Sequence, residues 1–182
     1  MRTVFINIHG GPGIGKTTFA SDLFSAIKKR HVDVEATAEF AKDLIRGGRA
    51  DLLSNQLVLL GGQALRLASL AGRVPLVIND SPLTLCSIYA SVYAPDRHPP
   101  AFHETVLWAH KALDNVDLVL SRHDHAYQVE GRVQDEKQAI AIDGMIIEHL
   151  RRNDVPHVIL PTENPLRAAL DVLAGAKIIP EK

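Results

Sequence analysis

Apolar residues follow two alternating patterns along the chain. Short apolar or alternating runs, typical of β-strands, are separated by longer stretches in which apolar residues recur every three or four positions, as in amphipathic helices. The predicted strands are residues 2–8, 31–38, 74–78, 116–121 and 155–160. The predicted helices are residues 15–30, 40–46, 52–71, 83–93, 102–113, 134–152 and 166–173. Strands that alternate with helices predict a parallel sheet covered by helices on both faces, which places the chain in the α/β class.

The loop after the first predicted strand has the sequence of a phosphate-binding loop, G-x-x-x-x-G-K-[ST], from Gly10 to Thr17. Glycines let consecutive N–H groups turn toward one anion, and the following helix adds its positive end. Lys16 is predicted to contact the β- and γ-phosphates of ATP, and Thr17 to bind Mg²⁺. The residues predicted to hold the nucleotide are Gly11, Pro12, Gly13, Ile14, Gly15, Lys16, Thr17 and Thr18.

Charged residues follow three of the predicted strands. Glu39 follows residues 31–38, Asp80 follows the near-continuously apolar run 74–78, and Arg122 follows residues 116–121. The carboxyl ends of parallel strands meet at one edge of the sheet, where ligands bind in open α/β folds. Asp80 is therefore predicted to orient Mg²⁺ together with Thr17. Either Glu39 or Asp80 could act as the base that activates an acceptor hydroxyl.

Two arginines flank an irregular stretch between a predicted strand and a predicted helix. Arg122 precedes it, and Arg132 lies close to the start of the helix. We predict a lid over about residues 122–135 that closes over the phosphates and excludes water, so that ATP is not hydrolysed. Both arginines are candidate catalytic cations.

Substrate contacts are predicted from two helices. Gln63 and Arg66 are polar residues on the helix 52–71, and Tyr89 lies on the helix 83–93. Each could contact a polar substrate, and each could equally be an ordinary surface or packing residue. The pair Gly61-Gly62 costs helix stability, which indicates that a neighbouring element or a ligand comes close there.

Composition restricts the class of protein. The 182 residues are 46% hydrophobic and 23% charged, which indicates a globular chain with a sizeable core. The formal net charge of −1 gives no general argument for nucleic-acid binding. The lone Cys86 excludes an intramolecular disulfide, and no apolar run is long enough to cross a membrane. We expect a cytoplasmic protein, with a flexible tail over residues 177–182 and homodimer formation left open.

The chain resembles the compact P-loop kinases of nucleosides and nucleotides, which include deoxynucleoside kinases, thymidylate kinase and the nicotinamide riboside kinase–like ATPase group. The matching pieces are Gly10–Thr17, Glu39 with Phe40-Ala41-Lys42, Asn79-Asp80-Ser81-Pro82, and Glu130-Gly131-Arg132. The resemblance implies a three-layer sandwich over residues 1–176 with strand order 2-3-1-4-5. It also implies a base at the position of Glu39 and phosphate clamps at Arg122 and Arg132.

The turn after Asp80 departs from one branch of that group. Deoxynucleoside kinases usually have Arg after the acidic residue, whereas this chain has Ser81-Pro82. The turn is more similar to the nicotinamide riboside kinase–like group and to virus-encoded kinases, some of which phosphorylate 5-hydroxymethyluracil in DNA. The predicted function is ATP- and Mg²⁺-dependent phosphorylation of a hydroxyl on a nucleoside, a nucleotide or hydroxymethylated DNA. The alternative is a nucleotide-binding ATPase that acts as a regulatory switch.

Overall fold

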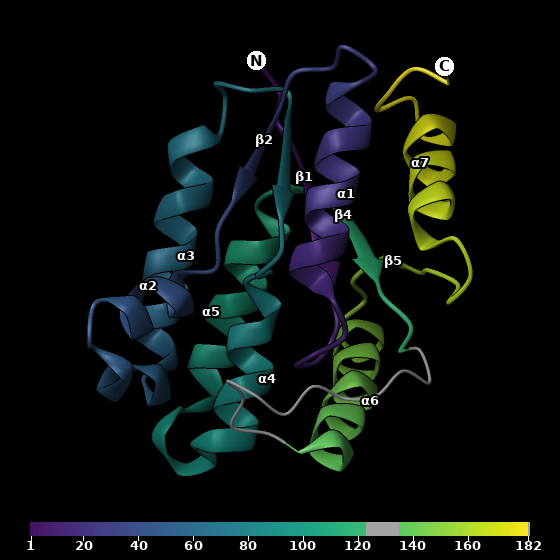
Figure 1. Ribbon diagram of the computed structural model, residues 1–182. Helices are drawn as coiled ribbons and strands as arrows, with labels where there is room; N and C mark the ends of the chain where they lie inside the picture. Colours follow the sequence, from purple (N-terminus) through teal and green to yellow (C-terminus); the bar gives the residue numbers. More distant parts are fainter. Residues whose placement is uncertain (123–134, 182) are drawn as a thin grey trace.

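The computed structural model describes residues 1–122 and 135–181. Most of the predicted lid, including Arg132 and the Glu130-Gly131-Arg132 match, lies outside these residues. The fold is a parallel sheet between two layers of helices (Figure 1). Within the described residues, no helix combines the length and apolar character that a membrane span requires.

Five parallel strands form the sheet. They are β1 (Val4–His9), β2 (Val34–Thr37), β3 (Leu76–Asn79), β4 (Asp114–Val119) and β5 (His157–Ile159). Their order is β2-β3-β1-β4-β5, which confirms the predicted topology. Asn7 of β1 pairs with Asn79 of β3 and with Asp117 of β4, so all three side chains lie on the same face of the sheet.

The helices match the predicted ones closely. They are α1 (Lys16–Lys28), α2 (Phe40–Arg46), α3 (Gln56–Leu70), α4 (Thr84–Tyr93), α5 (Pro100–Lys111), α6 (Glu136–Arg152) and α7 (Pro165–Gly175), with short 3₁₀ turns η1 (Ala50–Ser54) and η2 (Pro95–Arg97). The predicted helix 52–71 is divided at Asn55. The Asn55 side chain accepts a hydrogen bond from the N–H of Leu57 and so caps α3.

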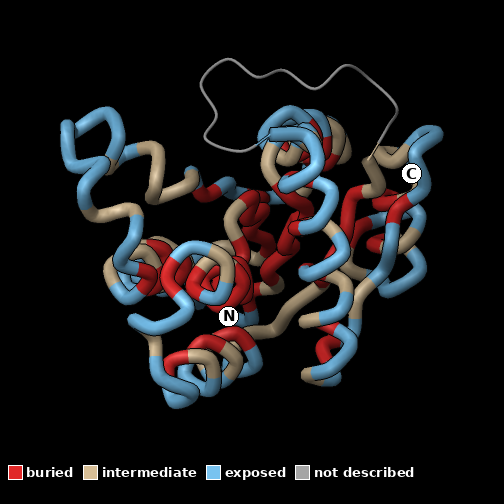
Figure 2. The backbone as a smooth tube through the Cα atoms, turned by 90° about the horizontal axis from the view of Figure 1, so that it is seen from below, coloured by how far each residue is buried: buried red, intermediate tan, exposed pale blue. Residues whose placement is uncertain are grey.

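Apolar side chains from both helix layers pack against the sheet. Helices α1 and α7 cover one face, where Ile6 and Ile8 of β1 pack against Leu23 and Leu173. Helices α3, α4, α5 and α6 cover the other face. Figure 2 shows the buried residues concentrated along the sheet and on the helix sides that face it. This core fixes the loops that follow the strands, and these loops carry the predicted site.

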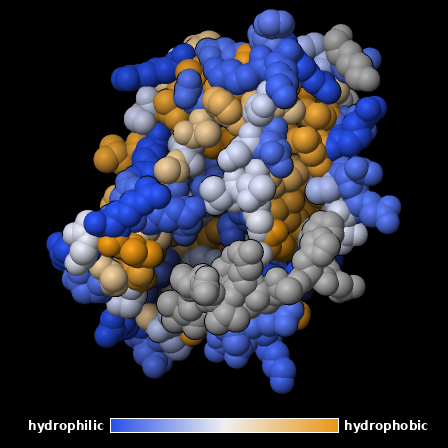
Figure 3. Space-filling model, viewed as in Figure 1, coloured by the Kyte–Doolittle hydropathy of each residue, from blue (hydrophilic) through white to orange (hydrophobic). Residues whose placement is uncertain are grey.

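The end of the chain contributes to the core. Ile179, within the stretch predicted as a flexible tail, is 4% exposed and packs with α1 and α7. Arg30 donates a hydrogen bond to the carbonyl of Pro180 over 2.8 Å. In the space-filling view, hydrophilic residues cover most of the rim, and a band of apolar residues reaches the surface beside α1 (Figure 3).

Helices α2 and α3 contact one another through Gly62. A Cβ atom on Gly62 would lie 2.3 Å from the ring of Phe40, whereas a Cβ on Gly61 would meet no atom within 4 Å. The close approach predicted from the glycine pair is thus confirmed at Gly62. Because Phe40 is the first residue of α2, this contact determines where α2 begins.

Candidate active site

The phosphate-binding loop joins β1 to α1. Gly13 and Gly15 have φ values of 78° and 96°, in the left-handed region that favours glycine. Gly15 is the N-cap of α1 and has no side chain to cap it, so the first N–H groups of the helix point into the loop. This arrangement binds an anion well, because the helix dipole adds positive potential at the same place.

Lys16 lies against this loop. Its ammonium donates to the carbonyls of Gly10 and Gly11, over 2.7 and 3.1 Å. Burial lowers the pKa of Lys16, and the charges of Glu39, Asp80 and Asp143 oppose that shift. The three carboxylates therefore favour the charged ammonium that a phosphate site requires.

Thr17 and Asp80 are brought together as the sequence predicted. The Thr17 hydroxyl donates to Asp80 Oδ2 over 2.9 Å. Asp80 is 6% exposed, and its Oδ1 has no hydrogen-bond partner among the described residues. A buried carboxylate oxygen beside a hydroxyl is a donor set that suits Mg²⁺, which prefers oxygen ligands. The residues present therefore fit the metal that a phosphate-binding loop implies.

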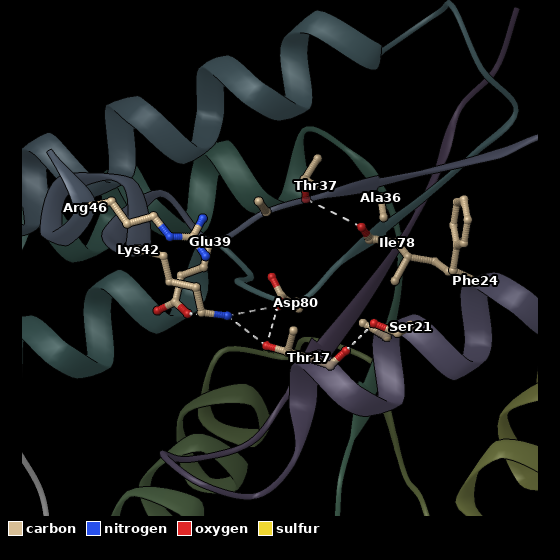
Figure 4. Close-up of a pocket in the computed structure, with 12 residues that line it drawn as sticks. Thr17, Ser21, Phe24, Ala36, Thr37, Glu39, Lys42, Arg46, Ile78 and Asp80 are labelled. Atoms are coloured by element: carbon tan, nitrogen blue, oxygen red, sulfur yellow. Dashed lines mark hydrogen bonds and ion pairs between the residues drawn. The ribbon is translucent and has the colours of Figure 1, made fainter. Parts of the chain in front are cut away.

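Lys42 also lies at this position, although it was not among the predicted site residues. Its ammonium donates to Thr17 Oγ1 over 2.9 Å, and it lies 3.5 Å from Glu39 Oε2 and 3.9 Å from Asp80 Oδ2 (Figure 4). The spacing of Glu39 and Lys42, three residues apart at the start of a helix, could have indicated their ion pair but not the contact of Lys42 with Thr17.

An open groove of about 380 Å³ begins at these residues. Polar lining residues gather at one end of the groove and apolar ones at the other (Figure 4). The polar end includes Thr17, Glu39, Lys42, Arg46 and Asp80. The apolar lining residues, from α1, β2 and β3, include Ala20, Phe24, Ala36 and Ile78. The groove can therefore hold a ligand with an apolar ring and a polar group at the Thr17 end.

Arg122 lies on the opposite side of the phosphate-binding loop. Its Nη2 donates to the carbonyl of Pro12 over 3.0 Å, and its Nε donates to Asp143 Oδ2 over 2.6 Å. Asp143 Oδ1 in turn accepts from the N–H of Gly11 over 2.6 Å. Sequence reasoning missed Asp143, which lies one turn beyond Ala139 on the inward side of α6. The pair Arg122–Asp143 places a cation beside the loop.

The three predicted substrate residues have different surroundings. Gln63 is 2% exposed; its Nε2 donates to Asn79 Oδ1 over 3.0 Å, and its Oε1 accepts from the N–H of Phe40 over 3.1 Å. Arg66 donates to the carbonyl of Ala38 over 2.8 Å and pairs with Asp43. In the structure, therefore, Gln63 and Arg66 hold the segment that carries Glu39.

Tyr89 is the predicted substrate residue whose pKa is shifted in part by charged residues of the site. Its ring stacks on Tyr93 with 5.8 Å between centroids. Burial raises the pKa of Tyr89, and the nearby charges of Glu39 and Asp143 raise it further. Tyr89 is therefore a neutral hydroxyl at neutral pH, able to donate a hydrogen bond.

Polar side chains join four strands beneath the site. Thr37 Oγ1 donates to Asn79 Oδ1 over 3.1 Å, and Asn79 Nδ2 donates to Asn7 Oδ1 over 2.9 Å. Asn7 Nδ2 donates to Asn115 Oδ1 over 2.9 Å. We call these four residues the amide ladder. It crosses β2, β3, β1 and β4 on the face that α3, α4, α5 and α6 cover.

A buried carboxylate connects two histidines behind the loop. Asp117 Oδ1 lies 2.7 Å from His9 Nε2, and Asp117 Oδ2 lies 3.2 Å from His110 Nε2. Burial opposes ionisation of Asp117, but the hydrogen bonds from His110 and His9 outweigh it and lower the Asp117 pKa to about 2. Burial lowers the pKa of His9, whose Nδ1 has no partner among the described residues. His9 is thus neutral and donates to the carboxylate.

The lowered pKa values of His9 and His149 predict a loss of stability in mild acid. Burial lowers the pKa of His149 from 6.5 to about 4, in the same direction as His9. Between about pH 6.5 and about pH 4, the unfolded chain binds protons that the folded chain does not. The free energy of unfolding should therefore fall as the pH decreases from about 6.5 to about 4, as measured by urea unfolding at about pH 7.5 and about pH 5.

A variant with one of these groups removed provides the control. His149→Leu is expected to show a shallower decline than the wild type, because one group that gains a proton on unfolding is absent. A free energy of unfolding that stays constant between the two pH values would contradict the assignment of neutral buried histidines.

One protein family and several solved structures match the chain. A model of an AAA domain family matches residues 5–166. No curated protein matches the chain in sequence. A NadR protein in complex with NAD and AMP-PNP is similar at a TM-score of 0.73 and 16% identity, over 99% of this chain and 51% of NadR. A NadR structure with NR has a TM-score of 0.71 and 17% identity, over 95% and 51%. The chain thus spans about half the length of these NadR proteins.

Two nucleoside and nucleotide kinases share the fold along almost their entire length. Deoxyadenosine kinase from M. mycoides has a TM-score of 0.61 and 15% identity, over 95% of this chain and 98% of the kinase. Thymidylate kinase from Ehrlichia chaffeensis has a TM-score of 0.61 and 14% identity, over 95% and 100%. These likenesses show the P-loop kinase-like α/β fold. With the family match over residues 5–166, the chain belongs to the AAA domain family.

Proposed function

We propose that this chain is an ATP- and Mg²⁺-dependent kinase that phosphorylates a hydroxyl of a nucleoside- or nucleotide-type acceptor. The observation that carries the proposal is the meeting of Lys16, Thr17, Asp80 and Glu39 beside one open groove. Solved structures of the same fold support it, since one holds NAD and AMP-PNP and another holds the product dCMP. We take residues 1–176 as the kinase domain.

The residues divide the work of phosphoryl transfer. The loop N–H groups and Lys16 would bind the phosphates of ATP, and Thr17 with Asp80 would hold Mg²⁺. The metal ion, when bound, neutralises charge on the phosphate oxygens. Arg122 adds a cation beside the loop, where its partner Asp143 orients the guanidinium. Such charges are already in position when the reaction begins, and in this reaction class they supply most of the rate enhancement.

Glu39 is proposed to accept the proton of the acceptor hydroxyl. It lies two residues beyond the end of β2, lines the polar end of the groove and is half-buried. Asp80 is less suited to the role, because its Oδ2 accepts a hydrogen bond from Thr17 and its carboxylate is proposed to hold Mg²⁺. Tyr89 is neutral, and the charges of Glu39 and Asp143 act on its hydroxyl. We propose that this hydroxyl contacts the acceptor.

Replacing Glu39 with glutamine is expected to lower kcat by about 10²- to 10⁴-fold, the usual contribution of a general base. The Kd for ATP should change little, because Glu39 does not lie in the phosphate-binding loop. Steady-state kinetics and ATP titration measure the two quantities. Glu35→Gln is the matched control, since Glu35 is an exposed carboxylate on β2, the strand that precedes Glu39. Near-normal turnover by Glu39→Gln would assign the base to Asp80 instead.

The acceptor can be identified by transfer of label from γ-labelled ATP. Separate reactions would contain nucleosides, nucleoside monophosphates and DNA with 5-hydroxymethyluracil. We expect transfer to a free nucleoside or nucleotide, because the groove is of ligand size and the net charge of −1 gives no general attraction to DNA. No transfer to any acceptor in the presence of Mg²⁺ would refute the kinase proposal.

The family match favours a second candidate, a nucleotide-binding ATPase that acts as a switch. AAA domain proteins need not transfer the phosphoryl group to a small acceptor, and only residues 5–166 define the match. Release of phosphate in the absence of an acceptor distinguishes this candidate. A kinase should release phosphate slowly until its acceptor is added.

A further inference from the structure

The ammonium of Lys42 lies beside the Thr17 and Asp80 oxygens that would hold the proposed metal ion, and beside the proposed base Glu39. It lies 2.9 Å from Thr17 Oγ1, 3.5 Å from Glu39 Oε2 and 3.9 Å from Asp80 Oδ2. Figure 4 shows the Lys42 side chain extended from α2 toward Asp80 and Thr17 at the polar end of the groove. A side-chain cation therefore lies beside the two groups, Thr17 and Asp80, whose oxygens fit Mg²⁺.

The Thr17 hydroxyl makes this competition direct. It donates its hydrogen to Asp80 Oδ2 and accepts a hydrogen bond from Lys42 Nζ. A metal ion coordinated by this hydroxyl needs an oxygen lone pair and a position close to Asp80. Lys42 already uses a lone pair there, and a second positive charge a few ångströms away would be repelled.

Lys42 can leave this position without disturbing the core. Its side chain is 39% exposed, and α2 contains no buried residue. Other contacts hold α2 and its approach: Gln63 accepts from the N–H of Phe40, and Arg66 binds the Ala38 carbonyl and the Asp43 carboxylate. Rotation of the flexible lysine side chain is therefore sufficient to move the ammonium.

We propose that Lys42, which also pairs with Glu39, is a built-in counter-ion that competes with the divalent cation for Thr17 and Asp80. The proposal rests on the proposed function, because it assumes that a metal ion accompanies the nucleotide at this site. Lys42 keeps the affinity for the metal ion alone low. The metal binds well only together with nucleotide phosphates, whose negative charge compensates for the displaced ammonium. Glu39 and Asp80 therefore lie beside a cation both before and after the metal ion binds.

The test is the binding of Mn²⁺ alone, followed through the electron paramagnetic resonance signal of the unbound ion. Lys42→Met is expected to bind Mn²⁺ at least about tenfold more tightly than the wild type, which corresponds to about 1.4 kcal/mol. Lys42→Gln, which retains a hydrogen-bond donor, should shift affinity in the same direction. Arg46→Met is the matched control, because it removes one charge one turn later on the same helix. It should change the affinity by less than about threefold, since only long-range attraction is altered.

The melting temperature gives a second readout. In EDTA, Lys42→Met should melt below the wild type, because Glu39 and Asp80 then lose one of their nearby cations. Added Mg²⁺ should raise its melting temperature more than that of the wild type. An unchanged or weaker affinity of Lys42→Met for Mn²⁺ would overturn the proposal. Binding of ATP to the wild type is measured separately: a failure there would refute the kinase proposal, whereas the Mn²⁺ comparison would still decide the role of Lys42.

Discussion

Replacing Lys16 with alanine is expected to reduce phosphoryl transfer by about 10²- to 10³-fold or more. Lys16 is the only loop side chain with an ammonium, and it is already directed at the carbonyls of Gly10 and Gly11. Loss of one fixed donor at a site of developing charge typically has an effect of this size. Steady-state kinetics with the acceptor found in the label-transfer reactions would measure kcat and KM for ATP.

Lys29→Ala is the control for this substitution. Lys29 is exposed and lies at the opposite end of α1, so the variant loses the same charge far from the phosphate-binding loop. Its kinetics should equal those of the wild type. If Lys16→Ala kept more than about a tenth of wild-type turnover, the loop would not serve the phosphates, and the kinase proposal would lose its main support.

Replacing Gly62 with alanine is expected to destabilise the protein and impair the site together. The new Cβ would lie 2.3 Å from the Phe40 ring, so the ring must move as a whole. Overpacking of this kind costs about 1–3 kcal/mol. Phe40 directly follows Glu39 and begins the helix that carries Lys42, so kcat should fall as well. Urea unfolding measures the first effect and steady-state kinetics the second.

Gly61→Ala separates this packing effect from the helix propensity of alanine. A Cβ at Gly61 meets no atom within 4 Å, so the variant should gain about 0.5–1 kcal/mol from the better helix former. The two neighbouring substitutions should therefore change the free energy of unfolding in opposite directions. If Gly62→Ala were as stable as Gly61→Ala, the contact between α2 and α3 would not constrain the start of α2.

The parts of the site predicted from the sequence are those fixed by strand ends. Asp80 and Glu39 follow parallel strands, and because such ends share one edge of a sheet, the structure brings both to Thr17 and the groove. The hydrogen bonds that Gln63 makes within the protein could also have been predicted. Gln63 lies with Gln56, Leu60 and Leu67 on the buried side of α3, and a buried amide normally finds partners within the protein.

Lys42 and Asp143 could not be predicted in the same way. Each lies on a helix, and its contact with the phosphate-binding loop or with Thr17 depends on how that helix packs. Local spacing indicates which face a helical residue occupies, but not which loop lies opposite that face. The division of the long predicted helix at Asn55 was, by contrast, open to prediction, because asparagine is a preferred N-cap.

The amide ladder has a consequence for how the sheet assembles. Shifting β3 by one residue relative to β1 would turn Asn79 toward the apolar side chains of α1, and Asn7 would lose its partner. Each buried amide left unpaired costs about 1–3 kcal/mol. Misaligned sheets formed during folding are thus penalised at several strands at once. Correct alignment also brings the ends of β1 and β3 level. The amide ladder therefore favours the register in which Asp80 can reach Thr17.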